Sequence, residues 1–126
     1  MISFDKNKIE NLDKIYRLNL INSCTGYKSA NLIGSVDTNG NTNLAIFSSI
    51  THLGSDPAMI GFVLRPRTVP RNTYNNLFTT KFFTVNHVKS DDIEDAHHTS
   101  AKYPKEISEF DKTKFEAEYL DGFIAP

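Results

Sequence analysis

The chain has 126 residues and a mass of 14.2 kDa, a size that suits one domain and leaves no room for two. About a quarter of the residues are Leu, Ile, Val or Phe, which is enough to form a folded core. The 14 basic and 15 acidic side chains give a formal charge of −1, and this balance argues against a surface for nucleic acid or anionic membranes. We therefore expect residues 1–126 to form a single domain.

The sequence also bears on the compartment. Residues 1–6 lack the basic and then apolar layout of a secretory signal, and no apolar stretch approaches the roughly 20 residues that cross a bilayer. The single cysteine, Cys24, cannot form an intramolecular disulfide and fits a reducing compartment. We expect a cytoplasmic protein that contacts neither membrane nor nucleic acid.

The first predicted element is a helix over residues 5–20, where apolar side chains recur at a spacing of three to four. Gly26 follows small polar residues and suits the end of this helix. Residues 32–36 and 41–47 then predict a β-hairpin, because Asn39-Gly40 between them readily supplies the two positive φ angles of a type I′ turn.

The second half of the chain predicts further strands joined by short helices. Residues 58–64 are apolar at both odd and even positions, so both faces of a strand here would be apolar. This is typical of a strand covered on both faces, in the centre of a sheet or in a barrel. The other predicted elements are a short helix over 71–77 that begins after Pro70, a strand over 81–88, a capped helix within 90–101, a helical turn over 111–115 and an edge strand over 115–120. The fold class is mainly β with flanking helices. An open sheet of so few strands would leave its apolar faces exposed. We therefore expect the strands to form a barrel or to pair with another chain.

A cluster of basic and hydroxyl side chains lies between residues 64 and 73. Arg65, Arg67 and Arg71 stand with two threonines around the start of the short helix. Guanidinium groups, hydroxyls and free helix N–H groups all donate to anions, so this segment predicts a phosphate site. A solvated turn with ordinary surface arginines explains the cluster equally well. Neither a dinucleotide-binding glycine motif nor a P-loop is present.

Two weaker patterns also deserve a chemical interpretation. Small residues alternate from residue 43 to the hydroxyl pair Ser48 and Ser49, which would let a flat ring approach the backbone, although an ordinary strand edge is the simpler interpretation. The four histidines do not have the spacing of a zinc motif, and no nucleophile elbow accompanies them. We expect no metal site and assign no catalytic residue.

Taken in chain order, five segments resemble the flavin reductase-like, FMN-binding split-barrel family. The segments are residues 30–40, 43–49, 56–57, 71–76 and 83–86, and the resemblance covers residues 26–101. It implies a six-stranded antiparallel Greek-key barrel that forms a homodimer and binds FMN at or near the subunit interface. Relatives continue with further strands after the position of Pro126, so this chain corresponds to the N-terminal two-thirds of such a domain.

The resemblance also implies which residues contact the cofactor. The second strand would line the isoalloxazine ring and ribityl chain through Asn43, Ala45, Phe47, Ser48, Ser49 and Ile50. A second group would lie toward the phosphate: Arg65, Arg71, Asn72 and Thr73. His98 and Ser100 fall where relatives place contacts to nicotinamide or flavin.

The activity that the resemblance implies is hydride transfer from NADH or NADPH to flavin, with FMN as a bound cofactor or a diffusing substrate and a partner oxygenase as one recipient of reduced flavin. This chemistry belongs to the cofactor, which agrees with a sequence that lacks a catalytic constellation. Two alternatives remain: an FMN-binding or dimerisation module without enzymatic activity, and a β-barrel that binds single-stranded nucleic acid through aromatic strands such as residues 82–88.

Overall fold

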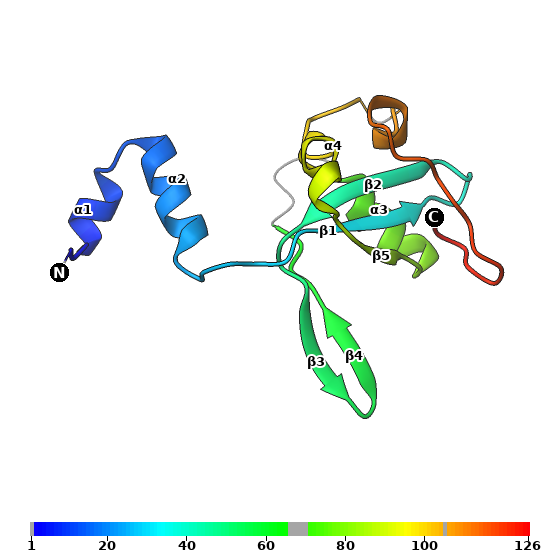
Figure 1. The fold of residues 1–126 in the computed structure, drawn as a ribbon, viewed down its shortest axis with the longest axis horizontal. Coiled ribbons are helices and arrows are strands. Elements are labelled where there is room, and N and C mark those ends of the chain that lie inside the picture. Colours follow the sequence, from blue (N-terminus) through cyan, green and yellow to red (C-terminus); the bar gives the residue numbers. More distant parts are fainter. Residues whose placement is uncertain (1, 66–70, 105) are drawn as a thin grey trace.

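A three-stranded antiparallel sheet lies at the centre of the computed structural model, which describes residues 2–65, 71–104 and 106–126 (Figure 1). The middle strand is β1 (Asn31–Val36), flanked by β2 (Thr42–Phe47) and β5 (Thr84–His87). All residues of β1 are buried, because this strand has a neighbour at both edges and helices over both faces.

The predicted β1–β2 hairpin is confirmed, but its turn is of another type. Gly40 has a φ of 87° and its N–H donates to Asp37 O over 3.2 Å, whereas Asn39 has no positive φ. The Asp37 carboxylate accepts from the backbone N–H groups of Asn39 and Asn41 over 2.8 and 2.9 Å. These bonds favour a type I turn followed by a glycine bulge, so the predicted type I′ turn is wrong.

The two turn types predict different mutational results. Gly40→Ala is expected to lower the free energy of unfolding by about 1–2 kcal/mol, because alanine is strained at this positive φ. Asn39→Ala is expected to change it by less than about 0.5 kcal/mol, because this residue is exposed and needs no special backbone angle. Urea unfolding of both variants checks the pair, and equal large losses would support the type I′ turn instead.

The core lies on one face of the sheet. Leu32 and Leu44 pack there against Ala96 of α4 (Ile93–His98). Four half-buried side chains complete this cluster: Ile46, Val88, Phe110 and Phe115. Two 3₁₀ helices, η1 (Ser90–Asp92) and η2 (Glu109–Lys112), adjoin α4 and β2 respectively.

Helix α3 (Asn72–Thr80) covers the opposite face of the sheet. A buried hydrogen bond joins the two layers, in which Asn76 Nδ2 donates to Ser35 Oγ over 3.2 Å. The predicted helix over 71–77 is therefore confirmed, while Pro70, expected at its start, lies outside the described residues. The strand predicted over 81–88 and the helix predicted within 90–101 are confirmed as β5 and as η1 with α4, and the helical turn predicted over 111–115 is η2.

Glu109 of η2 satisfies a backbone group at the edge of the sheet. Its Oε2 accepts from Leu44 N over 3.0 Å. Burial raises the pKa of the Glu109 carboxyl above its ordinary value of 4.5, and the hydrogen bond from Leu44 opposes this shift. Because the folded pKa lies above the unfolded one, Glu109 contributes stability that is complete below pH 4.5 and is lost as the pH rises through the folded pKa.

This sign predicts the behaviour of Glu109→Gln. The amide oxygen still accepts from Leu44 N, but the side chain no longer ionises. Relative to the original protein, the variant is expected to gain stability as the pH rises from about 4 to about 7. Unfolding curves across this range measure the trend, with the exposed Glu94→Gln as the matched control. A difference that stays constant with pH would contradict the prediction.

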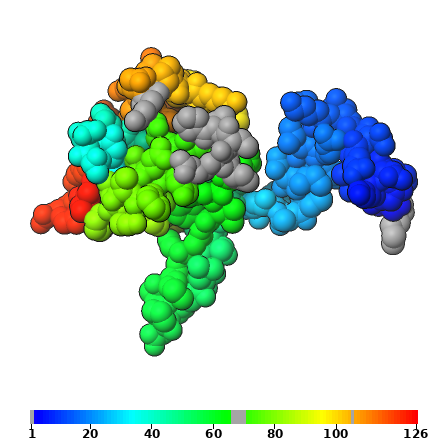
Figure 2. All heavy atoms as spheres, turned by 180° about the vertical axis from the view of Figure 1, so that it is seen from behind, coloured from blue at the N-terminus to red at the C-terminus, as the bar shows by residue number. Residues whose placement is uncertain are grey.

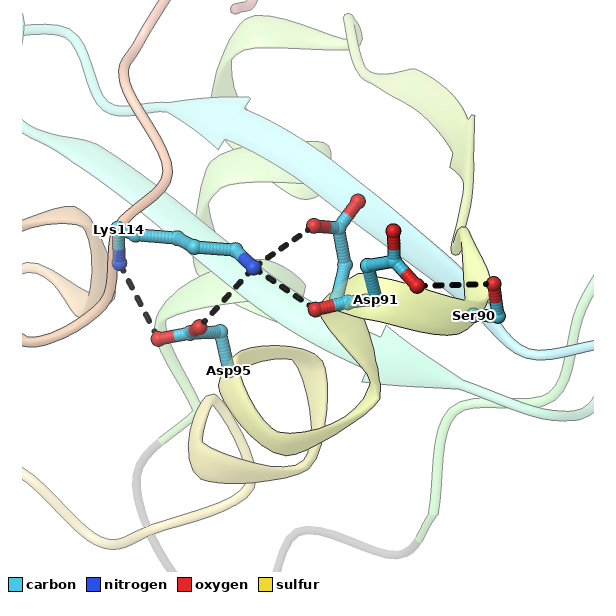
Figure 3. Close-up of polar contacts among 5 residues, drawn as sticks. Ser90, Asp91, Asp95 and Lys114 are labelled. Carbon is cyan, nitrogen blue, oxygen red and sulfur yellow. Dashed lines mark hydrogen bonds and ion pairs between the residues drawn. The ribbon is translucent and has the colours of Figure 1, made fainter.

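Lys114 ties the C-terminal segment to η1 and α4, as Figure 3 shows. Its Nζ lies 3.0 Å from Asp92 and 3.6 Å from Asp95, and it donates to Asp91 O over 2.8 Å. The hydrogen bond to Asp92 raises the pKa of Lys114. The group is solvent-exposed, so these contacts fix the path of the chain more than they stabilise the fold.

Residues after Lys114 do not form the edge strand predicted over 115–120. Alternation of apolar and polar side chains predicts a pleat, but a strand also needs a neighbouring strand to pair with, and this segment pairs with none of those described. The chain then returns to the sheet, where Ala125 is buried and Thr84 Oγ1 donates to Pro126 O.

A two-stranded hairpin projects from the body of the molecule (Figure 1). It consists of β3 (Thr51–Ser55) and β4 (Ala58–Gly61). Met59 and Ile60 are about half exposed, at 47% and 53%, so the prediction that residues 58–64 are covered on both faces is wrong for the chain by itself. Because β3 and β4 pair with each other and not with the central sheet, the five described strands form two separate sheets and no closed six-stranded barrel.

Two short helices form an N-terminal arm that stands apart from the sheet (Figures 1 and 2). These are α1 (Lys6–Glu10) and α2 (Lys14–Ser23), and neither contains a buried residue. The single helix predicted over 5–20 is wrong because Asp13 begins a second helix, where its carboxylate accepts from the N–H groups of Ile15 and Tyr16. The predicted end near Gly26 is confirmed, with a φ of 75° at that glycine. None of the helices in the described part of the chain has the length and apolar character to cross a bilayer.

Candidate functional site

The second strand presents three of the predicted cofactor residues on one face of the sheet. Asn43, Ala45 and Phe47 alternate along β2, and their partners in β1 are Ser35, Ile33 and Asn31. This is the face that α3 covers, since Ser35 bonds to Asn76 of that helix. The alternation in the sequence therefore assigned these side chains to a common face.

A buried hydrogen bond joins this strand to the first turn of α3. Asn43 Nδ2 donates to Thr73 Oγ1 over 2.9 Å, and the two residues are only 4% and 6% exposed. Asn43, predicted at the flavin ring, and Thr73, predicted at the phosphate, therefore contact each other. Their bond fixes where α3 begins relative to β2.

The start of α3 holds one buried donor that has no acceptor among the described residues. Arg71 is the N-cap residue of the helix, with extended backbone angles, and its own side chain makes no capping hydrogen bond. The Nε of Arg71 is buried and has no hydrogen-bond partner among the described residues. Asn72 follows it and is half-buried. A buried guanidinium donor without an acceptor is uncommon, and an anion at this position would satisfy it.

The segment after β2 holds the root of the projecting hairpin. Ser49 Oγ accepts from Val63 N over 3.1 Å and donates to Val63 O over 3.2 Å. Ile50 is half-buried beside it, and Ser48 is exposed. The hydroxyl of Ser49 is thus engaged with the backbone, whereas that of Ser48 faces solvent.

Aromatic rings cover the end of β2. Phe47 packs edge-on against Phe62 with ring centroids 5.1 Å apart, and Phe62 packs in the same way against Phe83 at 5.3 Å. Phe83 directly precedes β5, so this cluster connects the two edge strands of the central sheet to the root of the hairpin. Phe47 directly precedes Ser48 in the chain, so the cluster begins next to that serine in the sequence.

An open cavity of about 710 Å³ lies where the arm joins the body. Its lining comprises Asn22, Ser23, Gly26, Tyr27, Lys28, Ser48 and Arg65. It brings together Ser48 and Arg65, which the sequence assigned to the ring and the phosphate of one cofactor. Tyr27 and Lys28 were not predicted as site residues, because they follow the predicted helix in a segment without a motif. The only signal in the sequence is an aromatic residue next to a basic one.

His98 lies away from these residues. It belongs to α4, which packs on the Leu32 and Leu44 face of the sheet, opposite to the face of Asn43. Its Nε2 is 2.8 Å from the Tyr103 hydroxyl, and the two rings meet edge-on. Ser100 is exposed and donates to His97 O over 2.7 Å. The described residues contain no group of three or more His, Cys, Asp or Glu side chains that could hold a metal ion.

Comparison with known proteins identifies the family. The flavin reductase like domain matches residues 26–124, which is most of the chain. The chain belongs to this family. The resemblance that the sequence motifs carry is therefore confirmed. No curated protein matches the chain by sequence.

Solved structures of flavin reductase-like proteins share this fold. A crystal structure described as a flavin reductase with a split barrel domain, from Shewanella frigidimarina NCIMB 400, matches with a TM-score of 0.94 and 47% identity. The match covers 100% of this chain and 62% of that one, so this chain spans less than two-thirds of the length of that relative. The two sheets and flanking helices therefore have the fold of the matching part of that split-barrel relative, and the strands among the described residues do not close a barrel.

More distant structures agree in fold. Nitrilotriacetate monooxygenase component B from Bacillus cereus matches with a TM-score of 0.80 at 19% identity, over 100% of this chain and 62% of that one. The 2-nitrobenzoate 2-nitroreductase NbaA from Pseudomonas fluorescens matches with a TM-score of 0.79 at 20% identity, over 99% of this chain and 58% of that one.

Proposed function

We propose that this protein is an FMN-binding oxidoreductase that transfers hydride from NADH or NADPH to flavin. The observation that carries the proposal is the buried Nε of Arg71 at the start of α3, which has no hydrogen-bond partner in the part of the chain that the structure describes, in a chain of the flavin reductase-like family. A phosphate group fits this position, because it would supply the acceptor that Arg71 Nε lacks among the described residues, at the N-terminal end of a helix.

In this proposal the start of α3 holds the phosphate of FMN. Arg71 would donate from Nε, and Asn72 and the first helix N–H groups would donate beside it. Asn43 and Thr73 have a positioning role, because their mutual hydrogen bond fixes the helix start against β2. Arg65, which the resemblance assigned to the same phosphate, lines the cavity at the base of the arm, so its charge is placed at that cavity.

The ring and ribityl chain are assigned to the edge of the sheet. Ala45 and Phe47 share one face of β2, and the exposed Ser48 that follows them lines the arm cavity. Backbone N–H groups of residues 48–50 are the proposed donors toward the flavin ring. When bound, FMN supplies the hydride acceptor, so the protein needs to bind, orient and shield and does not need a strong acid or nucleophile.

Two measurements on the full chain test the proposal. FMN fluorescence is expected to be quenched saturably on titration with the protein, and oxidation of NADH or NADPH is expected to require protein and FMN together. Saturable binding without nicotinamide oxidation would support the alternative of a non-enzymatic FMN-binding module. Failure of FMN to bind would overturn the proposal.

We also propose that the protein is a homodimer. Large apolar side chains are exposed on the hairpin, including Leu53 and Ile60, and along α2, including Ile15 and Leu18. Projecting apolar elements of this kind mark interaction surfaces, and a second copy of the chain could cover them. The name of the Bacillus cereus neighbour, component B of a monooxygenase, supports the further proposal that reduced flavin passes to a partner oxygenase. The lone Cys24 still favours a cytoplasmic location.

A charge placed in the hairpin tests the dimer. Ile60→Asp is expected to convert a dimer to a monomer in light scattering coupled to gel filtration, because a carboxylate would be buried in the contact. Ile93→Asp is the matched control, since Ile93 is similarly exposed but lies on α4 in the body. A monomeric mass for the original protein, or a dimer that survives Ile60→Asp, would contradict the proposed interface.

A further inference from the structure

The cavity at the base of the arm has a strong excess of donors. Lys28 and Arg65 are its charged lining residues, and both are cations. Asn22, Ser23, Tyr27 and Ser48 add an amide and three hydroxyls, and no carboxylate is among the described lining residues. Two cations that share a cavity without a counter-charge favour an anionic ligand.

Neither Lys28 nor Arg65 forms an ion pair with any of the described residues. Lys28 Nζ lies 3.5 Å from Asn22 O, so it stands at the last turn of α2 without an ion pair among the described residues. Arg65 is exposed at the body side of the same cavity. The ligand would therefore lie between the arm and the body, with one cation on each side.

An exposed aromatic ring also lies at this cavity. The Tyr27 side chain is fully exposed, next to Lys28 and at the rim of the cavity. An exposed ring beside a cation is a suitable platform for a planar base, because base–aromatic stacking tolerates any base that has a π-face. A volume of about 710 Å³ lies within the range of cavities that hold nucleotide-sized ligands.

We propose that this cavity binds the adenosine diphosphate portion of the nicotinamide dinucleotide, with Lys28 and Arg65 on the pyrophosphate and Tyr27 against the adenine. The proposal rests on the proposed function, which makes a nicotinamide dinucleotide the substrate. It places that substrate at the arm, next to Ser48, where its other end can reach the flavin edge of the sheet. The arm then supplies part of the substrate site.

ADP-ribose is the probe that tests this inference, because it contains the pyrophosphate and adenosine but no nicotinamide ring. Isothermal titration of the FMN-loaded full chain is expected to show binding, and Lys28→Met is expected to weaken it by about fivefold to twentyfold through loss of a charge-assisted contact. Lys14→Met, which removes the same charge from the same arm outside the cavity, is expected to leave the affinity unchanged. Tyr27→Ala is expected to weaken binding and Tyr27→Phe to retain it.

The outcomes separate this inference from the proposed function. If Lys28→Met weakens ADP-ribose binding and leaves FMN affinity intact, the inference holds. If it weakens FMN and leaves ADP-ribose intact, or if ADP-ribose binds all variants equally or fails to bind the original protein, the inference is overturned. If FMN does not bind, the proposed function fails, whereas ADP-ribose binding to the unloaded chain with the same dependence on Lys28 would still support the cavity assignment.

Discussion

Thr73→Val is expected to lower the free energy of unfolding by about 1–3 kcal/mol, the cost of leaving a buried donor unsatisfied. Valine nearly matches threonine in shape, but it cannot accept the hydrogen bond that Asn43 Nδ2 donates over 2.9 Å. Both residues are almost fully buried, so water cannot replace the lost partner. Urea unfolding measures the loss.

Two further variants distinguish the hydrogen bond from packing. Thr73→Ser retains the hydroxyl and is expected to lose less stability than Thr73→Val. The double variant Asn43→Leu with Thr73→Val removes both polar groups and is expected to recover part of the loss, because no unsatisfied donor remains. A double variant whose loss equals the sum of the two single losses would show that the two side chains act independently.

Arg71→Met is expected to weaken FMN binding by about 1.5–3 kcal/mol, which is roughly tenfold to more than a hundredfold, the range for a hydrogen bond to a charged group. The physical reason is the buried Nε, which has no protein acceptor among the described residues and would gain one from the phosphate. Riboflavin lacks the phosphate, so its affinity is expected to be the same for Arg71→Met and for the original protein. Fluorescence quenching with both flavins measures the difference.

A control at the other end of the helix makes this prediction specific. Lys81 follows α3 and its Nζ lies 4.7 Å from the centre of the Phe78 ring, so Lys81→Met removes the same charge far from the helix start. We expect Lys81→Met to leave FMN affinity unchanged. Equal losses in Lys81→Met and Arg71→Met would indicate a general electrostatic effect, and no loss in Arg71→Met would remove this residue from the phosphate site.

The parts of the fold that depend on local sequence were predictable. The β1–β2 hairpin follows from Asn39-Gly40 between two strand-like segments, and α3 follows from Pro70, placed where a helix can begin. The turn type was not predictable from the Asn-Gly pair alone, because the Asp37 carboxylate stabilises a different turn through its bonds to Asn39 and Asn41. Short side chains that bond to the backbone can override a dipeptide preference.

Predictions that depend on distant contacts fared less well. The apolar residues of β4 correctly indicate a strand, but the sequence does not show whether that strand joins the central sheet or, as in the structure, only β3. Alternation over 115–120 predicts a strand for the same reason, yet no described strand lies beside it. Strand pairing is a property of two segments, so one segment alone cannot specify it.

The residues of the candidate site remain predictions, and the structure adds how they are arranged. The resemblance implies that Asn43 lies at the ring and Thr73 at the phosphate, whereas the structure joins the two side chains in one hydrogen bond. Arg71 gave a phosphate signal through its neighbours, but only the fold shows that its Nε is buried without a partner among the described residues. Lys28 shares a cavity with Arg65 because the arm joins the body of the molecule at that point, which the sequence alone does not show.

Anaerobic reduction of protein-bound FMN tests the proposed transfer of hydride from NADH or NADPH to the flavin. The full chain is loaded with one equivalent of FMN, freed of excess flavin and mixed with NADH or NADPH in the absence of oxygen, while the visible flavin absorbance is followed. We expect the absorbance to be lost with at least one of the two nucleotides, faster than in free FMN at the same concentration and more slowly in Lys28→Met. FMN that does not remain with the protein, or that is reduced no faster than free flavin, would contradict it.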